Sequence, residues 1–243
     1  MIACFQRWWL ISMTMLLILG CSGMKTSTKA SVQLNKYQVH RIALIPFDTM
    51  ATPQAVSSNG PSLSVPSGAQ RSEAPIAFPP MRYQDVRPTP THVVPPVAGE
   101  KITDLMWDKL KTRSGLDILS PRKAEAAARE LMGAGASSLA PVHKIAQRLS
   151  ADAALSGKVL VYQERVGGRL GADPPAAVGF EVKLVASDGV VLWEGNYYEK
   201  QRPMIEDFLG FIQRYGMFVT AEELAAYGAA ELLEAFPFGA TTD

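Results

Sequence analysis

The chain has 243 residues, 47% hydrophobic and 19% charged, which indicates one or at most two globular domains and excludes a wholly disordered or fibrous protein. Its 24 basic and 23 acidic residues nearly balance without any basic run, which argues against nucleic acid as a partner. The three histidines (His40, His92, His143) and two cysteines (Cys4, Cys21) lack ligand spacing, so we expect no metal and no cofactor.

The first twenty residues have the pattern of a bacterial secretory signal. Arg7 precedes an apolar stretch from Trp8 to Leu19, which is shorter than the about 20 residues that a membrane-spanning helix needs. The stretch ends in small residues rather than in a basic stop-transfer cluster. We therefore expect residues 1–20 to be a signal peptide that is removed from the mature chain.

The end of this signal resembles the lipobox of bacterial lipoproteins, in the residues Ile18-Leu19-Gly20-Cys21. The resemblance implies that Cys21 receives diacylglycerol and fatty acid such as palmitate and becomes the first residue of the mature chain. A thiolate is the nucleophile that such alkylation requires. Ser22, rather than Asp, follows the cysteine, and by resemblance to known sorting rules this implies an outer-membrane anchor facing the periplasm. The alternative is an ordinary signal peptide in which Cys21 is incidental.

The next segments predict a tether, a strand and an insert. Residues 21–38 are mostly small and polar without a period, so we expect a flexible tether of about 55 Å when extended. Residues 40–47 form a continuous apolar run that is typical of a strand covered on both faces. Residues 48–99 contain ten prolines, which favours a long disordered insert within a single α/β domain spanning residues 39–238.

Regular structure is predicted again from Glu100. Apolar residues spaced for one helical face predict a helix that ends near Ser114, and residues 116–119 predict a strand after it. A strand, a crossover helix and a second strand favour parallel pairing of the two strands. Further helices are expected from Pro121 to Leu131 and over residues 142–149, followed by a strand over residues 153–165.

Alternating side chains then predict a β-hairpin. Residues 178–186 and 190–200 flank Asp188-Gly189, which is typical of a type I′ turn. This turn predicts three cross-strand pairs, namely Leu184 with Trp193, Phe180 with Tyr197, and Lys183 with Glu194. The fold class is therefore α/β, a two-layer or three-layer sandwich with a mixed sheet.

Two helices are expected after the hairpin. The first has an apolar face made by Ile205, Phe208, Leu209 and Ile212. The second is the terminal helix, which Thr220 opens with Glu223 three residues later, the pattern of a capping box. Beside the apolar face of the first helix, Phe211, Tyr215 and Phe218 form a second stripe that we interpret as a possible docking site for a partner.

Catalytic motifs are not evident in the sequence. No serine lies in a Gly-x-Ser-x-Gly elbow, and the glycine-rich stretches lack the spacing of a phosphate-binding loop. Glu164, Glu181, Glu194 and Glu199 lie on predicted strands. An alternative function is thus a lipid-anchored hydrolase of wall glycan that uses Glu164 or Glu194 as the acid. Because Glu181 and Glu194 fall on the polar face of the hairpin, we expect solvated charges and no enzyme.

Four segments together resemble a group of periplasmic lipoproteins: residues 41–47, 116–119, 145–159 and 188–193. The group includes the curli-secretion lipoprotein, the penicillin-binding-protein activator lipoprotein and the amino-terminal domain of the Tol-system propeller protein. The resemblance implies a small α/β sandwich that binds or assembles and offers no catalytic residue. We therefore expect a non-catalytic envelope lipoprotein that binds an envelope protein or associates with itself, as an accessory to wall synthesis, secretion or transport.

Overall fold

The computed structural model describes residues 25–51, 54–55, 91–132 and 140–240. The strands are β1 (Thr26–Ala30), β2 (Arg41–Leu44), β3 (Asp48–Thr49), β4 (Gln54–Ala55), β5 (Thr91–His92), β6 (Asp117–Leu119), β7 (Ala153–Gln163), β8 (Gly167–Gly168), β9 (Gly171–Ala172), β10 (Ala177–Ala186) and β11 (Val191–Lys200). The helices are the 3-10 turn η2 (Leu34–Lys36), then α2 (Val97–Leu110), α3 (Pro121–Met132), α4 (Val142–Arg148), α5 (Phe208–Gln213) and α6 (Ala221–Glu234).

The main sheet is mixed, as the sequence predicts, with strand order β1-β11-β10-β7-β2-β6 and β3 paired with β7. β2 pairs in parallel with both β6 and β7, which confirms the strand, helix and strand unit. Each neighbouring pair among the other long strands is antiparallel, namely β7 with β10, β10 with β11, and β11 with β1. The α/β fold class is confirmed.

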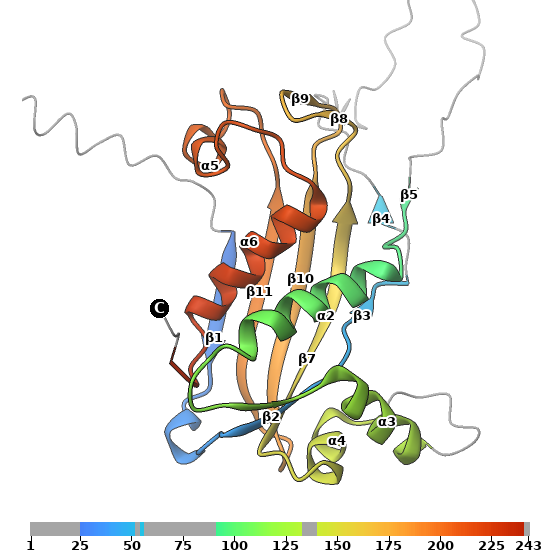
Figure 1. Cartoon of the computed structure of the whole chain (residues 1–243), viewed down its shortest axis with the longest axis vertical. Coiled ribbons are helices and arrows are strands. Elements are labelled where there is room, and N and C mark those ends of the chain that lie inside the picture. Colours follow the sequence, from blue (N-terminus) through green and yellow to red (C-terminus); the bar gives the residue numbers. More distant parts are fainter. Residues whose placement is uncertain (1–24, 52–53, 56–90, 133–139, 241–243) are drawn as a thin grey trace, which may run out of the picture.

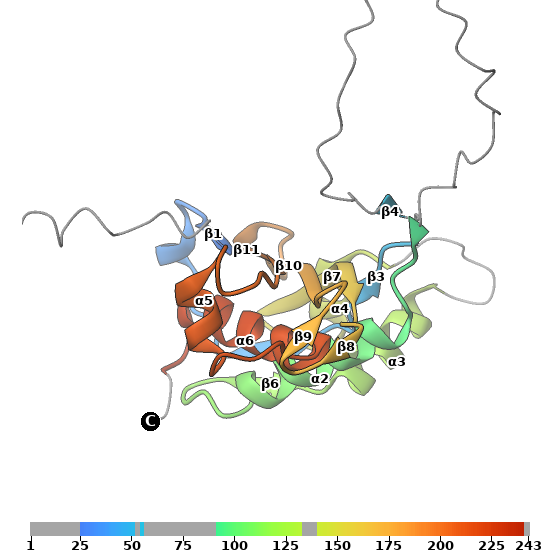
Figure 2. The same ribbon diagram turned by 90° about the horizontal axis from the view of Figure 1, so that it is seen from above.

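Helices cover the sheet unequally. α2 and α6 lie together on one face of the long strands (Figures 1 and 2). At the β2 end the other face is covered too, because Ile42 and Leu44 belong to the main core while Ala43 between them packs with Ala146 of α4. The fold is thus three-layered at β2 and two-layered along the hairpin, where Lys183, Asn196 and other side chains of the uncovered face meet solvent.

The predicted hairpin register is confirmed pair by pair, but its turn is different. Leu184 faces Trp193, Phe180 faces Tyr197 and Lys183 faces Glu194. Gly189 has φ of +96°, whereas Asp188 is not in the positive-φ region that a type I′ turn demands at both positions. The N–H of Gly189 donates to the carbonyl of Ala186 at 2.9 Å, so the connection is a three-residue loop with a bulge.

The Asp188 side chain explains this turn. Its Oδ1 accepts from the N–H of Val190 at 3.0 Å and its Oδ2 accepts from the Tyr37 hydroxyl at 2.7 Å. Both bonds favour the carboxylate, and they hold the pKa of Asp188 below its ordinary value. This local bonding of an aspartate competes with the type I′ conformation.

The predicted tether is wrong from residue 25 onward. Thr26–Ala30 is the edge strand β1, paired antiparallel with β11, and Leu34 and Tyr37 pack against the core. Backbone hydrogen bonding to β11 orders this polar segment, although it contributes almost no apolar side chain of its own. Cys21 and the rest of residues 1–24 lie outside the described residues.

The ends of the predicted insert are also part of the fold. Asp48–Thr49 pairs with β7, Val94 is buried, and α2 begins at Val97 instead of Glu100. At Gly99, a Cβ atom would come within 2.4 Å of the Phe47 carbonyl oxygen, so only glycine lets α2 approach the chain there. Residues 52–53 and 56–90 of the insert lie outside the described residues.

Candidate functional site

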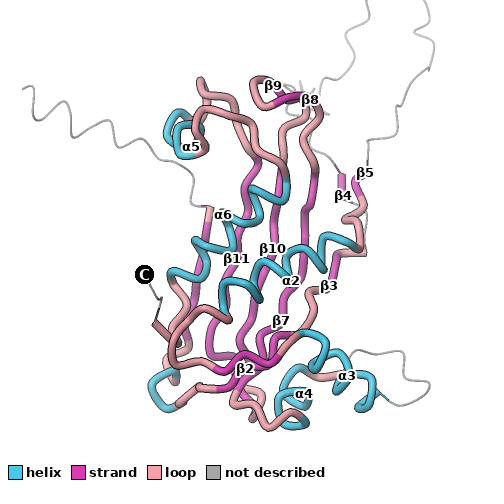
Figure 3. Tube along the Cα trace, viewed as in Figure 1, coloured by secondary structure: helices cyan, strands magenta, loops and turns pink. Residues whose placement is uncertain are grey.

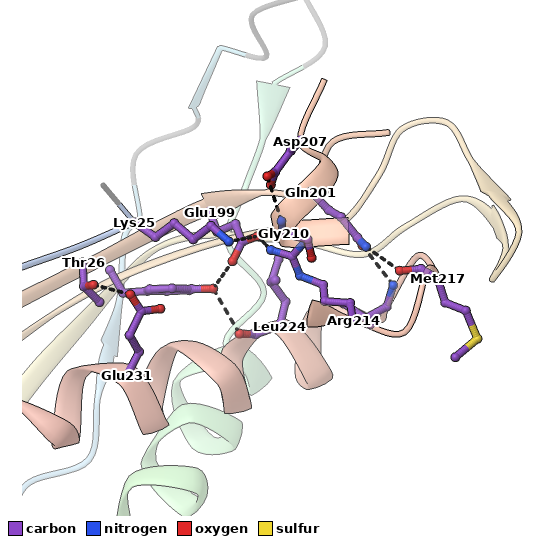
Figure 4. A network of polar contacts seen from close by, with 12 residues as sticks. Lys25, Thr26, Glu199, Gln201, Asp207, Gly210, Arg214, Met217, Leu224 and Glu231 are labelled. Carbon is purple, nitrogen blue, oxygen red and sulfur yellow. Dashed lines mark hydrogen bonds and ion pairs between the residues drawn. The ribbon is translucent and has the colours of Figure 1, made fainter. Parts of the chain in front are cut away.

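A buried cluster of charges lies where β11 ends (Figure 4). Glu199, 6% exposed, forms ion pairs with Lys25 at 3.4 Å and with Arg214, and it accepts from the Tyr197 hydroxyl at 2.7 Å. Burial, with a further contribution from Arg214, lowers the pKa of the Lys25 ammonium. Burial lowers the pKa of Arg214 and raises that of the Tyr197 phenol. The Glu199 carboxylate therefore contacts Lys25 just before β1, Tyr197 in β11 and Arg214 at the end of α5.

The segment between β11 and α6 is fixed by further polar contacts. Gln201, 1% exposed, donates to the carbonyl of Met217 at 2.7 Å and accepts from the N–H of Val219 at 2.9 Å. Asp207 caps α5 by accepting from the N–H of Gly210 at 2.9 Å, and Arg214 donates to the Gly210 carbonyl at 2.6 Å. These hydrogen bonds hold α5 and the segment around it at the end of the sheet.

The predicted apolar face of this helix points outward, which contradicts the sequence-based expectation. Ile205 precedes α5 and is 89% exposed, and Phe208 and Ile212 are more than half exposed. The Leu209 side chain lies outside the described part of the structure. Asp207 caps α5 at Phe208, so Ile205 lies before the helix and does not belong to a helical face.

The predicted docking stripe is correspondingly wrong in part. Phe218 is buried and packs edge-on against the half-buried Phe211, with ring centroids 5.7 Å apart. Tyr215 alone of the three predicted residues is strongly exposed, at 82%. The exposed large hydrophobic side chains of this segment, called the α5 surface here, are Met204, Ile205, Phe208, Ile212 and Tyr215.

Tyr215 adopts φ of +56°, a conformation that favours glycine. The N–H of Gly216 donates to the Phe211 carbonyl and the N–H of Tyr215 to the Ile212 carbonyl, both at 2.9 Å, a pair of bonds typical of a helix that ends in a left-handed residue. A tyrosine at this position costs backbone energy and holds its ring out in solvent.

The candidate catalytic carboxylates have structural partners. Both oxygens of Glu164 accept from the N–H of Ala221 at 3.2 Å, at the start of α6. Glu194 pairs with Lys183 at 3.5 Å on the uncovered face of the hairpin, as predicted. Glu223 and Thr220 complete the predicted capping box. Across the described ranges, no group of three potential ligands is placed to hold a metal ion.

None of the helices in the described ranges has the length and apolar character needed to cross a membrane. Sequence comparisons identify no matching family model and no curated protein.

Solved structures show a distant resemblance. The PelC dodecamer from Paraburkholderia phytofirmans is 12% identical with a TM-score of 0.44, and the match covers 88% of this chain and 99% of that one. Lipoprotein GNA1162 from Neisseria meningitidis is 13% identical with a TM-score of 0.36, over 72% of this chain and 96% of that one. The LpoB C-terminal domain from Salmonella enterica is 11% identical with a TM-score of 0.33, over 68% and 85%.

Proposed function

We propose that the protein is a non-catalytic lipoprotein of the cell envelope, anchored in the outer membrane through a lipidated Cys21 and facing the periplasm. It acts by binding an envelope protein or by associating with itself. The observation that carries this proposal is the sequence Ile18-Leu19-Gly20-Cys21 at the end of an apolar signal, followed after only three further residues by Lys25, where the described fold begins. Lipid on the Cys21 thiol would anchor the domain to the membrane with only three residues between them.

The roles of the carboxylates favour binding over catalysis. A general acid needs a carboxyl group free to exchange a proton with substrate. Glu164 instead accepts from the backbone at the start of α6, and Glu194 is an ion-pair partner of Lys183. These contacts give both residues a structural purpose, which weakens the case for the hydrolase alternative.

Lipidation is tested by Cys21→Ser, with Cys4→Ser as the matched control in the same signal segment. We expect Cys21→Ser to accumulate as a precursor that takes up no labelled palmitate, while Cys4→Ser matures normally. Normal maturation of Cys21→Ser would end the lipoprotein proposal.

Binding is tested by crosslinking in intact cells, together with Glu164→Gln and Glu194→Gln in cells that lack the native copy. We expect both variants to complement and to retain the crosslinked partner. A folded, membrane-bound variant that fails to complement while keeping its partner would favour the hydrolase instead.

A further inference from the structure

We propose that the α5 surface lies in the lipid bilayer that holds Cys21, so that the domain contacts the membrane both through its lipid and through α5. This inference rests on the proposed function in taking Cys21 as the anchored residue. According to this inference, lipid and not protein covers the α5 surface.

The chain length between Cys21 and the fold sets a limit on distance. Three residues separate Cys21 from Lys25, and four Cα-to-Cα steps span at most about 15 Å. Lys25 is fixed in the domain, because its carbonyl accepts from the N–H of Tyr198 at 2.9 Å and its ammonium pairs with Glu199. The membrane surface must therefore lie within about 15 Å of Lys25, little more than the width of one helix.

The α5 surface is at this same end of the domain. Glu199 contacts both Lys25 and Arg214, and Arg214 ends α5. Figures 1 and 3 show α5 and the β8–β9 hairpin at one end of the molecule, with α3 and α4 at the opposite end. The hairpin adds Leu170, 90% exposed, and is joined to the α5 segment by the N–H of Phe218, which donates to the Arg169 carbonyl at 2.7 Å.

The side chains of this end suit a bilayer interface. Ile205, Phe208 and Ile212 are apolar and exposed, and Tyr215 has the apolar ring with a polar tip that favours the headgroup region. Loss of residues 1–20 removes Arg7 and no acid, which leaves equal numbers of basic and acidic residues in the mature chain. The segment before α5 also exposes one residue of each charge, Arg202 and Glu206, so adsorption would depend on apolar contact rather than on anionic lipid.

The backbone at Tyr215 supports the same assignment independently. A glycine would satisfy the positive φ without strain, whereas tyrosine pays a conformational cost to present an exposed ring. Such a cost is reasonable where the ring serves a contact outside the domain.

The test uses the mature chain, residues 21–243, in which Cys21 is the single cysteine. Coupling this thiol to a maleimide lipid in phosphatidylcholine vesicles reproduces the anchor without the cellular lipidation enzymes. Phe208→Trp places a fluorophore on the α5 surface, and Val32→Trp is the matched control, because Val32 is fully exposed and follows the far end of β1. The parent chain supplies the background from Trp107 and Trp193.

In vesicles whose acyl chains carry bromine as a quencher, we expect the added emission of Phe208→Trp to fall by roughly half, since interfacial side chains reach the acyl boundary. The emission of Val32→Trp should not change. Equal emission changes at the two positions would overturn the proposal. Self-association of the uncoupled chain that Phe208→Glu abolishes, measured by sedimentation, would also overturn it by showing that a second copy covers the surface. Because the anchor is attached chemically, these results are independent of the palmitate labelling that tests Cys21 in cells.

Discussion

Arg214 and Glu199 form an ion pair in which the side chains are only 3% and 6% exposed. Breaking such a pair leaves a buried charge that has lost its partner, which typically costs 3 to 5 kcal/mol. Because Lys25 still faces Glu199 in Arg214→Met, we expect a loss of about 3 kcal/mol in the free energy of unfolding, at the low end of that range. Urea denaturation measures this loss.

Arg129→Met is the matched control, since Arg129 pairs with Glu125 on the surface of α3, where the side chains are 71% and 49% exposed. Exposed pairs contribute about 0 to 1 kcal/mol, so the control should be nearly neutral. A loss for Arg214→Met as small as that of the control would mean that the Arg214 pair does not hold α5 to the sheet.

Tyr215→Gly should make the fold more stable and membrane contact weaker. Glycine adopts positive φ readily, so we expect a gain of about 1 kcal/mol. Ser150→Gly is the control, because Ser150 has φ of +51° and follows α4 with the same pair of hydrogen bonds, far from α5. Thermal unfolding should rise for both variants, whereas quenching of Phe208→Trp in anchored vesicles should weaken only with Tyr215→Gly. If quenching of Phe208→Trp is the same with Tyr215→Gly as with Ser150→Gly, Tyr215 does not contact the bilayer.

Trp193→Ala should strongly destabilise the domain. Trp193 is 1% exposed, faces Leu184 across the hairpin and packs edge-on against Phe236, with ring centroids 5.2 Å apart. Removing a buried aromatic costs about 3 to 5 kcal/mol. Tyr198→Ala on the uncovered face, where Tyr198 is 56% exposed, should cost less than about 1 kcal/mol in the same denaturation experiment. The reverse order would mean that the two faces of the hairpin are exchanged.

The hairpin register is predictable from the sequence because alternation along two adjacent strands leaves one register that pairs apolar with apolar residues. The buried place of Glu199 follows from the same alternation, since Glu199 shares a face with Tyr197 and Trp193. The pairing of Glu199 with Arg214 is not predictable from this alternation, because Arg214 lies on another element and meets Glu199 through tertiary packing alone.

β1 is not predictable by hydrophobic pattern, because backbone bonds to β11 and not apolar side chains place it. Its local signal is limited to β-branched Thr26 and Thr28. The sequence also predicts wrongly that the apolar face of α5 points into the core, for a related reason. An apolar stripe predicts burial of some kind, but not whether protein or another phase covers it.

The capping box of α6 predicts a pH dependence. The N–H of Thr220 donates to Glu223 at 2.8 Å, and this bond holds the pKa of Glu223 below its ordinary value of 4.5. A lowered pKa in the folded state means that the stabilisation is complete above the unfolded value and is lost as the pH falls through the folded one. The stability difference between the parent chain and Glu223→Gln should therefore shrink below pH 4.5. A difference that is constant or grows on acidification would show that the carboxylate charge contributes nothing to the cap.

A spacer between Cys21 and Lys25 should separate anchoring from orientation. Inserting about twelve Gly and Ser residues after Met24 adds about 20 Å of average reach, which lifts the limit that keeps the α5 end at the membrane. Palmitate labelling of Cys21 and recovery in the membrane fraction should be unchanged, because the lipobox-like residues are untouched. Quenching of Phe208→Trp in anchored vesicles should decrease, since the effective concentration of the α5 surface at the bilayer falls. The same residues appended after Asp243 are the control and should leave quenching as it was. Undiminished quenching with the spacer would show that the short connection from Cys21 does not place α5 at the membrane.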